Sequence, residues 1–228
     1  MAQEDSLRER LIDVGVDVVM TDGIAALGLR EIARRAGVSH GAPRRYFATH
    51  HELLSAIARR GFADLGARFE VATAAVAAPR RRLEALARTY VGYALEHRGM
   101  FELMFRHDLL DSGPHASPGP RLRESTLPLF ETIVALIAEC RAERESAHRG
   151  GGRDTARGDD AAPPPAVTAA ALWSNLHGIA QLWVWDSLQL ALDTPSAEAA
   201  PDGGRLELLV TAALDAHIGP ATTSPAAA

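Results

Sequence analysis

The chain has 228 residues, of which 47% are hydrophobic and 23% charged, a balance that is ordinary for a globular protein and excludes a disordered one. No run of about 18 apolar residues occurs, and the acidic start Met1-Ala2-Gln3-Glu4-Asp5 lacks the basic region of a signal peptide. A single cysteine, Cys140, excludes an internal disulfide and a cysteine-based metal site. These features favour a cytoplasmic protein without a membrane partner.

The basic charge is concentrated near the N-terminus. The chain carries a net charge of −5, yet residues 30–60 hold seven arginines against two acidic residues, a local excess of +5. On a chain that is acidic as a whole, this distribution favours one anion-binding patch over general affinity for polyanions.

The first two predicted elements are helices. Ser6-Leu7-Arg8-Glu9 has the form of a capping box and apolar residues recur at helical spacing after it, so a helix is predicted from near Ser6. Gly23 is placed to end this helix, because a positive φ costs glycine little. A second helix is predicted from about Leu29 to Ala36, stopping at Gly37. Its buried face consists of Ile32, Ala33 and Ala36.

A third helix is predicted to follow Ser39 and to end near Phe47. Because Pro43 lacks a backbone N–H, this helix should be short or irregular early on. Thr49-His50-His51-Glu52 is another capping box, which predicts a long fourth helix toward Ala75.

The rest of the chain is also predicted to be helical, which makes the fold class all-α. No alternating β pattern occurs, and helices are expected at about 80–96, 99–110, 121–146, 166–191 and 204–217. Residues 148–165 contain triple glycine and triple proline runs and bury too little apolar area to offset their ordering entropy, so a mobile loop is expected there. The tail after Gly219 is expected to be disordered.

The segment of about residues 28–47 carries the functional prediction. Ala33 and Ala36 are small where two short helices would cross, and Gly37 supplies a tight turn. Val38 is expected to fill the angle between the helices, and Phe47 to anchor the second one on the core. Ser39 can cap that helix and leave its first N–H groups facing outward, where a phosphate can bind.

The other side chains of this short helix are hydrogen-bond donors and cations: His40, Arg44, Arg45 and Tyr46. Such a face suits the major groove of DNA. The alternative is a solvated helical hairpin whose arginines have no special role. The coincidence of turn, cap, basic excess and aromatic anchor favours DNA binding.

The segment resembles the N-terminal domain of the tetracycline-repressor (TetR) family of bacterial transcription regulators. The resemblance covers about residues 5–65 and rests on Leu-Arg-Glu-Ile-Ala at 29–33, Ala-Gly-Val-Ser at 36–39, Gly41-Ala42, Phe47 and Leu53-Leu54. It implies a three-helix helix-turn-helix DNA-binding domain over residues 5–65, followed by a larger helical domain for ligand binding and dimerisation over residues 66–219.

Four positions bear on how closely the chain follows the family pattern. Gly28 stands where the family usually has a Ser or Thr cap, and Arg44 replaces a Tyr that commonly touches phosphate. Tyr46 stands where His or Tyr is usual. His50 replaces a common Lys and is a weaker, pH-dependent substitute for it.

The resemblance also implies roles for single residues on double-stranded operator DNA. Those expected to contact phosphates are Ser39, Arg44, Tyr46 and His50. Those expected to face base edges are His40, Gly41, Ala42, Pro43 and Arg45, with Arg45 the candidate for a bidentate guanine contact. Flanking the groove are Arg30, Arg34 and Arg35, some of which are only solvated or paired with Glu31.

Further along the chain, Trp173 with His177-Gly178 resembles the Trp…His-Gly pattern of the WHG-type C-terminal domain found in part of this family. The family implies a homodimer formed through about 166–191 and 204–217. For His177 we predict a core histidine bonded to a backbone carbonyl, because no second His or carboxylate lies at i+4 to complete a metal pair. Neither a metal nor a cofactor is predicted.

The family further implies an effector pocket, here for a small hydrophobic or aromatic molecule whose binding shifts the dimer away from its DNA-binding conformation. Met and aromatic residues at helical spacing also form ordinary core, which stays the alternative. The residues expected to line the pocket are Tyr90, Tyr93, Met100, Phe101, Met104, Phe105, Phe130, Trp173, His177 and Trp185.

The function predicted from the sequence is therefore a ligand-responsive, DNA-binding transcriptional repressor. An enzyme is disfavoured, because the chain contains no Gly-rich phosphate loop, no His-Glu-x-x-His, no Gly-x-Ser-x-Gly and no paired Cys. A helical dimerisation or small-molecule-binding protein whose DNA-binding face has decayed is the other alternative.

Overall fold

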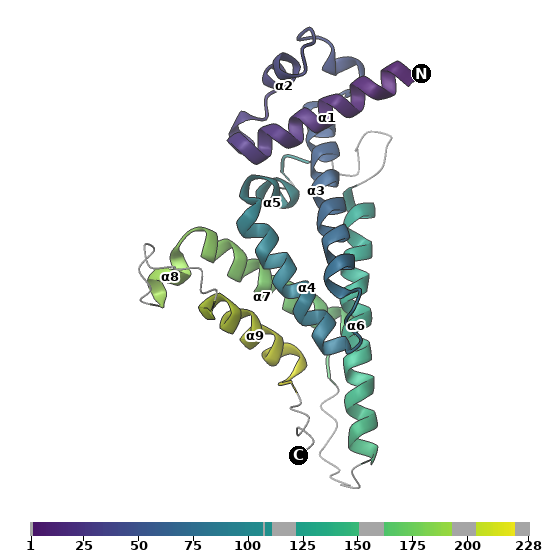
Figure 1. The fold of residues 1–228 in the computed structure, drawn as a ribbon, viewed down its shortest axis with the longest axis vertical. Helices are drawn as coiled ribbons and strands as arrows, with labels where there is room; N and C mark the ends of the chain where they lie inside the picture. The colour runs from purple at the N-terminus through teal and green to yellow at the C-terminus, as the bar shows by residue number, and fades with distance from the viewer. Residues whose placement is uncertain (1, 107, 111–121, 151–161, 193–203, 222–228) are drawn as a thin grey trace. The chain divides into compact units, whose positions relative to one another are not determined.

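The computed structural model describes residues 2–106, 108–110, 122–150, 162–192 and 204–221 (Figure 1). Over these residues the chain forms α-helices and two 3₁₀-helices and no strand, which confirms the predicted all-α class. The same residues contain no helix that is long and apolar enough to cross a membrane.

The chain divides into two compact units. Unit 1 comprises Met1–Ala67 and Tyr93–Pro128, and unit 2 comprises Arg68–Gly92 and Leu129–Ala228. The boundaries differ from a simple division near residue 65, because residues 93–128 group with the N-terminal segment. The assignment of residues 5–65 to DNA binding and of residues 66–219 to ligand binding stays a prediction.

Unit 1 is built around α1, which packs against α2, η1 and α5. The elements with residues in this unit are α1 (Ala2–Asp22), η1 (Ile24–Ala26), α2 (Leu29–Arg35), η2 (Pro43–Arg45), α3 (His50–Thr73), α4 (Pro79–Glu96), α5 (Arg98–Phe105) and α6 (Leu122–Gly150). Its core includes the fully buried side chains of Leu11, Ile32, Phe47, Leu53, Ile57, Leu103 and Met104. Burial of these apolar groups is the main source of the unit's stability.

The ends of α1 and α3 show how far local signals determine helix boundaries. At α3, the Glu52 N–H donates to Thr49 Oγ1 at 3.0 Å and Glu52 Oε2 accepts from the Ala48 N–H at 2.8 Å, so the predicted capping box is present with its carboxylate bonded one residue upstream. The predicted start of the first helix near Ser6 is wrong, since α1 begins at Ala2. Ala, Gln and Glu favour a helix, and carboxylates stabilise its N-terminal end, so nothing stops the helix at Ser6. Gly23 follows the last residue of α1 with φ 78°, as predicted.

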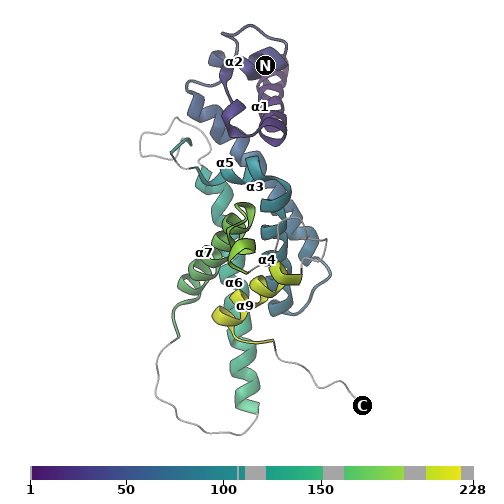
Figure 2. The same cartoon turned by 90° about the vertical axis from the view of Figure 1, so that its left-hand side faces the viewer.

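Unit 2 contains α7 (Pro165–Val184), α8 (Ser187–Ala191) and α9 (Gly204–Ile218), together with residues of α3, α4 and α6. Helix α7 packs against both α9 and α8, as Figures 1 and 2 show. The single helix predicted over 166–191 is wrong, because the chain leaves the helix after Val184. Asp186 adopts the left-handed conformation with φ 57°, which a short polar side chain tolerates better than an apolar one, and α8 restarts one residue later.

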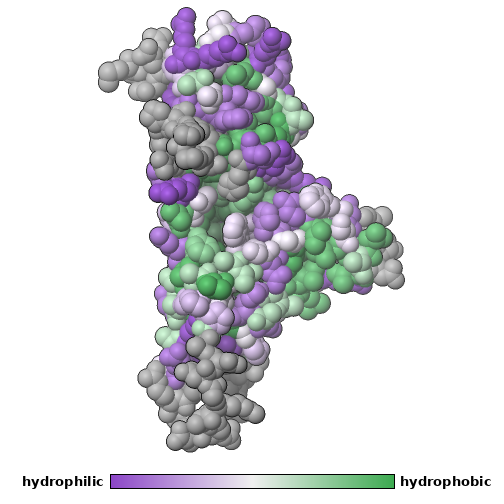
Figure 3. All heavy atoms as spheres, turned by 180° about the vertical axis from the view of Figure 1, so that it is seen from behind, coloured by the Kyte–Doolittle hydropathy of each residue, from purple (hydrophilic) through white to green (hydrophobic). Residues whose placement is uncertain are grey.

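Large apolar side chains remain exposed on this group of helices. Figure 3 shows hydrophobic side chains gathered over the part of unit 2 that α7, α8 and α9 form. Those with substantial exposure are Val167, Trp173, Leu182, Trp185, Leu190 and Leu208. Leu208, which is 68% exposed, lies on α9, whereas Ala213 and Leu214 of the same helix are buried.

Three other predicted boundaries also differ from the structure. The helix expected over 99–110 ends at Phe105, where Arg106 turns out of the helix and its guanidinium binds the Asp108 carboxylate at 2.8 Å. Helix α6 runs from Leu122 to Gly150, beyond the predicted end at 146, so the first residues of the predicted 148–165 loop are helical. The expected mobility of 151–161 and of the tail from 222 onward falls outside the described residues.

Candidate nucleic-acid interface

The turn after α2 is fixed by backbone hydrogen bonds and one glycine. The Val38 N–H donates to the Ala33 carbonyl at 3.0 Å and the Gly37 N–H donates to the Arg34 carbonyl at 3.2 Å, which is the Schellman arrangement. Gly37 has φ 67°, a conformation that strains residues with a side chain. The predicted tight turn at Gly37 is therefore confirmed, and it fixes the direction in which the next segment leaves α2.

The predicted third helix is short and irregular early on, as expected from Pro43, and it is a 3₁₀-helix. Between Ser39 and Phe47 the only helical residues are Pro43–Arg45, which form the 3₁₀-helix η2. An α-helix does not form because Pro43 has no N–H to donate and Gly41 has low helix propensity. Ser39 does not cap a helix. Its backbone carbonyl instead accepts the Ala42 N–H at 2.9 Å in a turn.

Two buried residues hold this segment on the core of unit 1. Phe47 is 2% exposed, which confirms the predicted anchor, and the Arg8 guanidinium lies 5.2 Å from the centre of its ring. Pro43 was predicted to face a base edge. It is buried, so its side chain cannot do so in this conformation. Between these anchors Arg44 and Arg45 are exposed.

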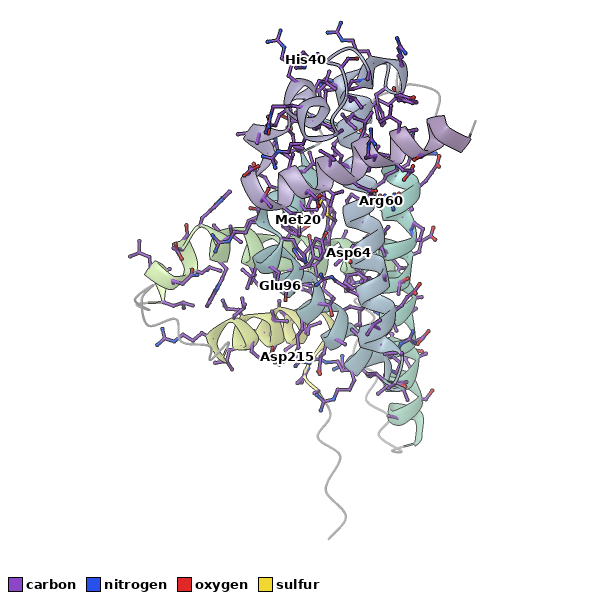
Figure 4. The ribbon with its side chains drawn as sticks, turned by 45° about the horizontal axis from the view of Figure 1, so that its top comes forward. Met20, His40, Arg60, Asp64, Glu96 and Asp215 are labelled. Atoms are coloured by element: carbon purple, nitrogen blue, oxygen red, sulfur yellow. The ribbon has the colours of Figure 1, made fainter. Side chains whose placement is uncertain are left out.

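Most of the other predicted contact residues lie at the surface of α2, of the Ser39–Phe47 segment or of the first residue of α3. The exposed ones are Arg30, Arg34, Arg35, Ser39, His40 and Gly41, and the half-buried ones are Ala42, Tyr46 and His50. Figure 4 places His40 at the outer edge of unit 1. The predicted residues thus lie on α2, on the turn with η2 and at the start of α3, and the second of these elements is shorter than expected.

The arginines of α2 and η2 fall into two classes. Arg34 and Arg35 bind the carboxylate of Glu31 at 2.6–2.9 Å, and Arg35 also binds the Asp22 carboxylate at the end of α1. Hydrogen bonds from the two guanidinium groups, Arg34 first, lower the pKa of Glu31 to about 2. The same bonds raise the pKa of both arginines, so all of these groups are ionised at neutral pH.

Arg30, Arg44 and Arg45 differ from this pair. They are exposed, and none of them forms an ion pair with any carboxylate of the described residues. Their guanidinium groups are therefore available to an external anion. The i+3 and i+4 spacing in the sequence predicted that Arg34 and Arg35 pair with Glu31. Nothing in the sequence indicated the contact between Arg35 and Asp22.

His50 has a role that the sequence did not indicate. Its Nε2 lies 2.7 Å from the Leu27 carbonyl oxygen, and because a carbonyl can only accept, Nε2 carries the proton and donates it. The bond ties the start of α3 to the residue before the α2 cap. Nδ1 can donate to a phosphate only when the ring carries a second proton, and the predicted phosphate contact stays a prediction.

In unit 2 the predicted Trp…His pair meets a tyrosine of α4. Trp173 Nε1 donates to the Tyr90 hydroxyl at 3.0 Å, and that hydroxyl lies 2.8 Å from His177 Nδ1. Burial lowers the pKa of His177, which favours the neutral ring with Nδ1 as acceptor, and burial raises the pKa of Tyr90, which keeps its proton. The Nδ1 contact of His177 is therefore with a side chain, and a bond from its other ring nitrogen to a backbone carbonyl stays a prediction. The histidine binds a side-chain hydroxyl.

The ten residues predicted to line a pocket divide between the units. Tyr93, Met100, Phe101, Met104 and Phe105 belong to unit 1, where both methionine sulfurs lie directly over Gly61 and Phe101 packs edge-on against Phe105 with ring centres 5.0 Å apart. The others, Tyr90, Phe130, Trp173, His177 and Trp185, belong to unit 2. Trp185 is 66% exposed. A single pocket lined by all ten stays a prediction.

The described residues contain no group of three or more His, Cys, Asp or Glu side chains that could hold a metal ion. Cys140 is a buried free thiol, and burial raises its pKa, which makes it less reactive.

Comparison with known proteins assigns the family. Residues 83–202, more than half of the chain, match the model of the tetracyclin repressor-like C-terminal domain, and residues 11–57 match that of bacterial regulatory proteins of the tetR family. Over 88 residues the chain is 35% identical to the HTH-type transcriptional regulator BetI of Rhizobium meliloti (strain 1021). That match covers 39% of this chain and 43% of BetI, so it spans less than half of this curated relative.

Two solved structures share the fold. A protein of unknown function from Rhodococcus sp. RHA1 is 30% identical, with 93% of each chain covered and a TM-score of 0.66. RolR, solved in complex with resorcinol, is 17% identical, with 95% of this chain and 90% of RolR covered and a TM-score of 0.57, a likeness of fold alone. The residues matched at both ends of the chain and the all-α architecture agree: this chain belongs to the TetR family of bacterial transcriptional regulators.

Proposed function

We propose that this TetR-family protein is a ligand-responsive repressor that binds a palindromic DNA operator as a homodimer. The observation that carries the proposal is the segment from α2 to η2, which is anchored by Phe47 and exposes Arg30, Arg44 and Arg45 without an internal carboxylate partner. Cations held on a rigid support, with no competing internal anion, are suited to phosphate and base-edge contacts.

In this proposal Arg45 faces a base edge and is the candidate for a bidentate guanine contact, with His40, Gly41 and Ala42 beside it. Arg44, Ser39, Tyr46 and His50 contact phosphates and set the register. A repressor of this kind acts in the cytoplasm, where the bacterial chromosome lies. No catalytic role is proposed.

A homodimer is supported by the apolar surface of α7 and α9. These helices pack on each other, yet Val167, Leu182 and Leu208 are at least 40% exposed on them. A second copy of this surface would remove these side chains from water, and a two-fold dimer would place two recognition segments about 34–36 Å apart, one helical turn of DNA.

For the effector we propose a small hydrophobic or aromatic molecule bound near Tyr90, Trp173 and His177. These three side chains combine a buried hydroxyl, an indole and a neutral imidazole, which suit an aromatic ligand with few polar groups. RolR, which shares the fold, binds resorcinol, an aromatic ligand of this kind. Effector binding shifts the dimer to a state of lower DNA affinity by the coupling free energy between the two sites.

The test is the binding of the purified protein to DNA from around its own gene, titrated against salt. The expected result is saturable binding to one near-palindromic site that weakens steeply as salt rises. The double variant Arg44→Ala/Arg45→Ala should lose most of this affinity, whereas Arg81→Gln, an exposed arginine of unit 2, should retain it. Equal binding of wild type and double variant would refute the proposal.

A further inference from the structure

We propose that Glu31 is a positioning residue that withholds Arg34 and Arg35 from DNA phosphates and leaves Arg30, Arg44 and Arg45 to bind the nucleic acid. This inference rests on the proposed DNA-binding function. It divides the arginines that the sequence alone treats as one basic patch.

The geometry that supports the division is a closed cluster of Asp22, Glu31, Arg34 and Arg35, termed here the Glu31 clamp. Arg34 grips Glu31 with two bonds, Nε to Oε2 at 2.9 Å and Nη2 to Oε1 at 2.6 Å. Arg35 donates from Nε to Glu31 Oε1 at 2.7 Å and from Nη2 to Asp22. Two cations and two carboxylates give the clamp a formal charge of zero.

Isolated surface ion pairs contribute little, but two-pronged arginine–carboxylate pairs and networks of several charges are the exceptions. The Glu31 clamp is both. A phosphate that approaches Arg34 must displace a carboxylate bound by two parallel hydrogen bonds, and the displaced Glu31 would then repel that phosphate. Phosphate binding to the clamp therefore costs the carboxylate contact and adds repulsion from Glu31. Arg30, Arg44 and Arg45 give up no carboxylate contact when they bind phosphate.

Arg35 also gives the clamp a geometric role. Its guanidinium joins Asp22, the last residue of α1, to Glu31 in the first turn of α2, while Arg35 itself ends α2. The Arg35–Asp22 bond and the buried side chains of Ile32 and Ala33 also hold α2 on α1, so the turn that leads to Arg44 and Arg45 stays in place without Glu31. Glu31 acts on DNA binding through Arg34 and Arg35 and does not touch DNA itself.

The salt dependence of DNA affinity separates the two classes. Each phosphate neutralised by a cation contributes about 0.9 to the magnitude of the slope of log K against log salt. One arginine that binds phosphate in both protomers of a dimer therefore contributes about 2. Because this contribution is independent of base sequence, a random-sequence duplex is a sufficient probe and no operator is required.

The experiment measures binding of the full chain to a random-sequence duplex at pH 7 over a series of KCl concentrations. Relative to wild type, Arg44→Gln should lower the slope by about 2, whereas Arg34→Gln should leave it unchanged. Glu31→Gln should raise the slope by about 2 and tighten the binding, because it releases Arg34 in each protomer while Arg35 keeps its bond to Asp22. Glu31→Asp, which keeps the carboxylate, should restore the wild-type slope.

Glu102→Gln is the matched control, because it removes an exposed carboxylate of unit 1 that pairs with Arg106, away from the clamp. It should leave the slope unchanged and so separate the release of Arg34 from the general gain of positive charge. Far-UV circular dichroism checks that each variant folds. If Glu31→Gln does not fold, the salt slopes of Arg34→Gln and Arg44→Gln still test whether Arg34 is withheld from phosphate.

The outcomes distinguish the two proposals. A wild-type protein that shows no salt-dependent affinity for DNA overturns the DNA-binding function itself. A wild-type protein that binds DNA, with a slope that falls equally in Arg34→Gln and Arg44→Gln, overturns only the role of Glu31, and so does a folded Glu31→Gln with the slope of Glu102→Gln.

Discussion

Gly28 leaves the first turn of α2 without a side-chain cap. Its backbone is extended, with φ −89° and ψ 141°, and no side chain accepts the N–H groups of the first turn. This is the conformation in which Ser or Thr normally caps a helix. The position is open, since nothing lies within 4 Å of where a Cβ would be.

Gly28→Ser should therefore stabilise the protein, by about 0.5 kcal/mol, because its hydroxyl accepts an N–H of the first turn. Urea unfolding measures the change as a higher midpoint at constant slope. Gly41→Ser is the control, since Gly41 is equally open but does not precede a helix. A midpoint that rises as much in the control would show that capping is not the cause.

His177 makes stability depend on pH in a defined direction. Burial lowers the pKa of His177 below its ordinary 6.5, and protonation would remove the acceptor for the Tyr90 hydroxyl. The unfolded chain therefore takes up a proton that the folded chain resists, so the free energy of unfolding falls as pH is lowered through 6.5.

His177→Gln should abolish this contribution while keeping an acceptor for Tyr90. The difference in unfolding free energy between wild type and variant should be constant above about pH 7.5. At lower pH the unfolding free energy of the wild type should fall relative to that of the variant. Denaturant unfolding at a series of pH values measures it. A difference that is constant across the whole range would mean that the pKa of His177 is the same in the folded and unfolded chain.

At the scale of elements, close approach of helices depends on single glycines. A Cβ at Gly99, near the start of α5, would lie directly against the backbone carbonyl of Val19 in α1. A backbone atom cannot rotate aside, so α1 and α5 would have to separate. Gly92 in α4 has nothing within 4 Å of the same position.

Gly99→Ala should destabilise the protein by about 1–3 kcal/mol through overpacking. Gly92→Ala, the matched control, should be neutral or stabilising by up to about 1 kcal/mol, because alanine favours a helix interior. Thermal unfolding measures both. Equal effects of the two substitutions would contradict the close contact between α1 and α5.

Ion pairs join α4 to α9 within unit 2. The Glu84 carboxylate is 7% exposed and binds Arg80 at 3.2 Å and Arg81 at 2.8 Å. Arg80 also reaches Asp215 and the Gly219 carbonyl at the end of α9. A second ion pair between α4 and α9 joins Arg88 to Glu207 at 2.6 Å, and its side chains are much more exposed than that of Arg80.

Glu84→Gln should cost about 3 kcal/mol, because it leaves the Arg80 guanidinium half-paired in a buried setting. Glu207→Gln should cost less than about 1 kcal/mol, because its pair is solvated. Urea unfolding compares them. The reverse order of the two costs would mean that the Arg80 network does not hold α9 in place.

Elements were predictable where their signals are local. The Thr49–Glu52 capping box and the Gly37 turn depend on residues within one turn of each other, and both were predicted correctly. The break at Asp186 was not predicted, because the apolar pattern of 166–191 continues through it, and the 3₁₀ form of Pro43–Arg45 was not, because Ser39 suggested a helix cap that the structure does not form. At the site, the residue types and the pairing with Glu31 were predictable, but the contact of Arg35 with Asp22 was not.

At the scale of the whole molecule, counting charge in a window of sequence overstates what is available for binding. The excess of +5 in residues 30–60 ignores partners outside that window. Asp22 binds Arg35, and Glu9 and Asp13 bind Arg60. Carboxylates distant in sequence thus neutralise arginines, and only the fold reveals which cations remain.

Assembly can be tested on α9. Leu208→Asp should weaken the proposed dimer, because it places a carboxylate on a side chain that a second copy would bury. Sedimentation velocity should show monomer at concentrations where wild type is dimeric, and operator affinity should fall with it. Val71→Asp is the control, since Val71 is 80% exposed on α3. Dimerisation that survives Leu208→Asp would place the interface elsewhere.

The short η2 helix has a consequence for how such a protein diverges. The segment is held by Pro43 and Phe47 and by the turn at Gly37, and none of these anchors involves the side chains of Arg44 or Arg45. With about three residues per turn, those two side chains leave the backbone in directions about 120° apart, so each can change without disturbing the other. On the proposed function, a copy that arises by gene duplication can acquire a new operator by substitutions at 40 and 45, while Arg44 keeps its phosphate contact, with little loss of stability along the way.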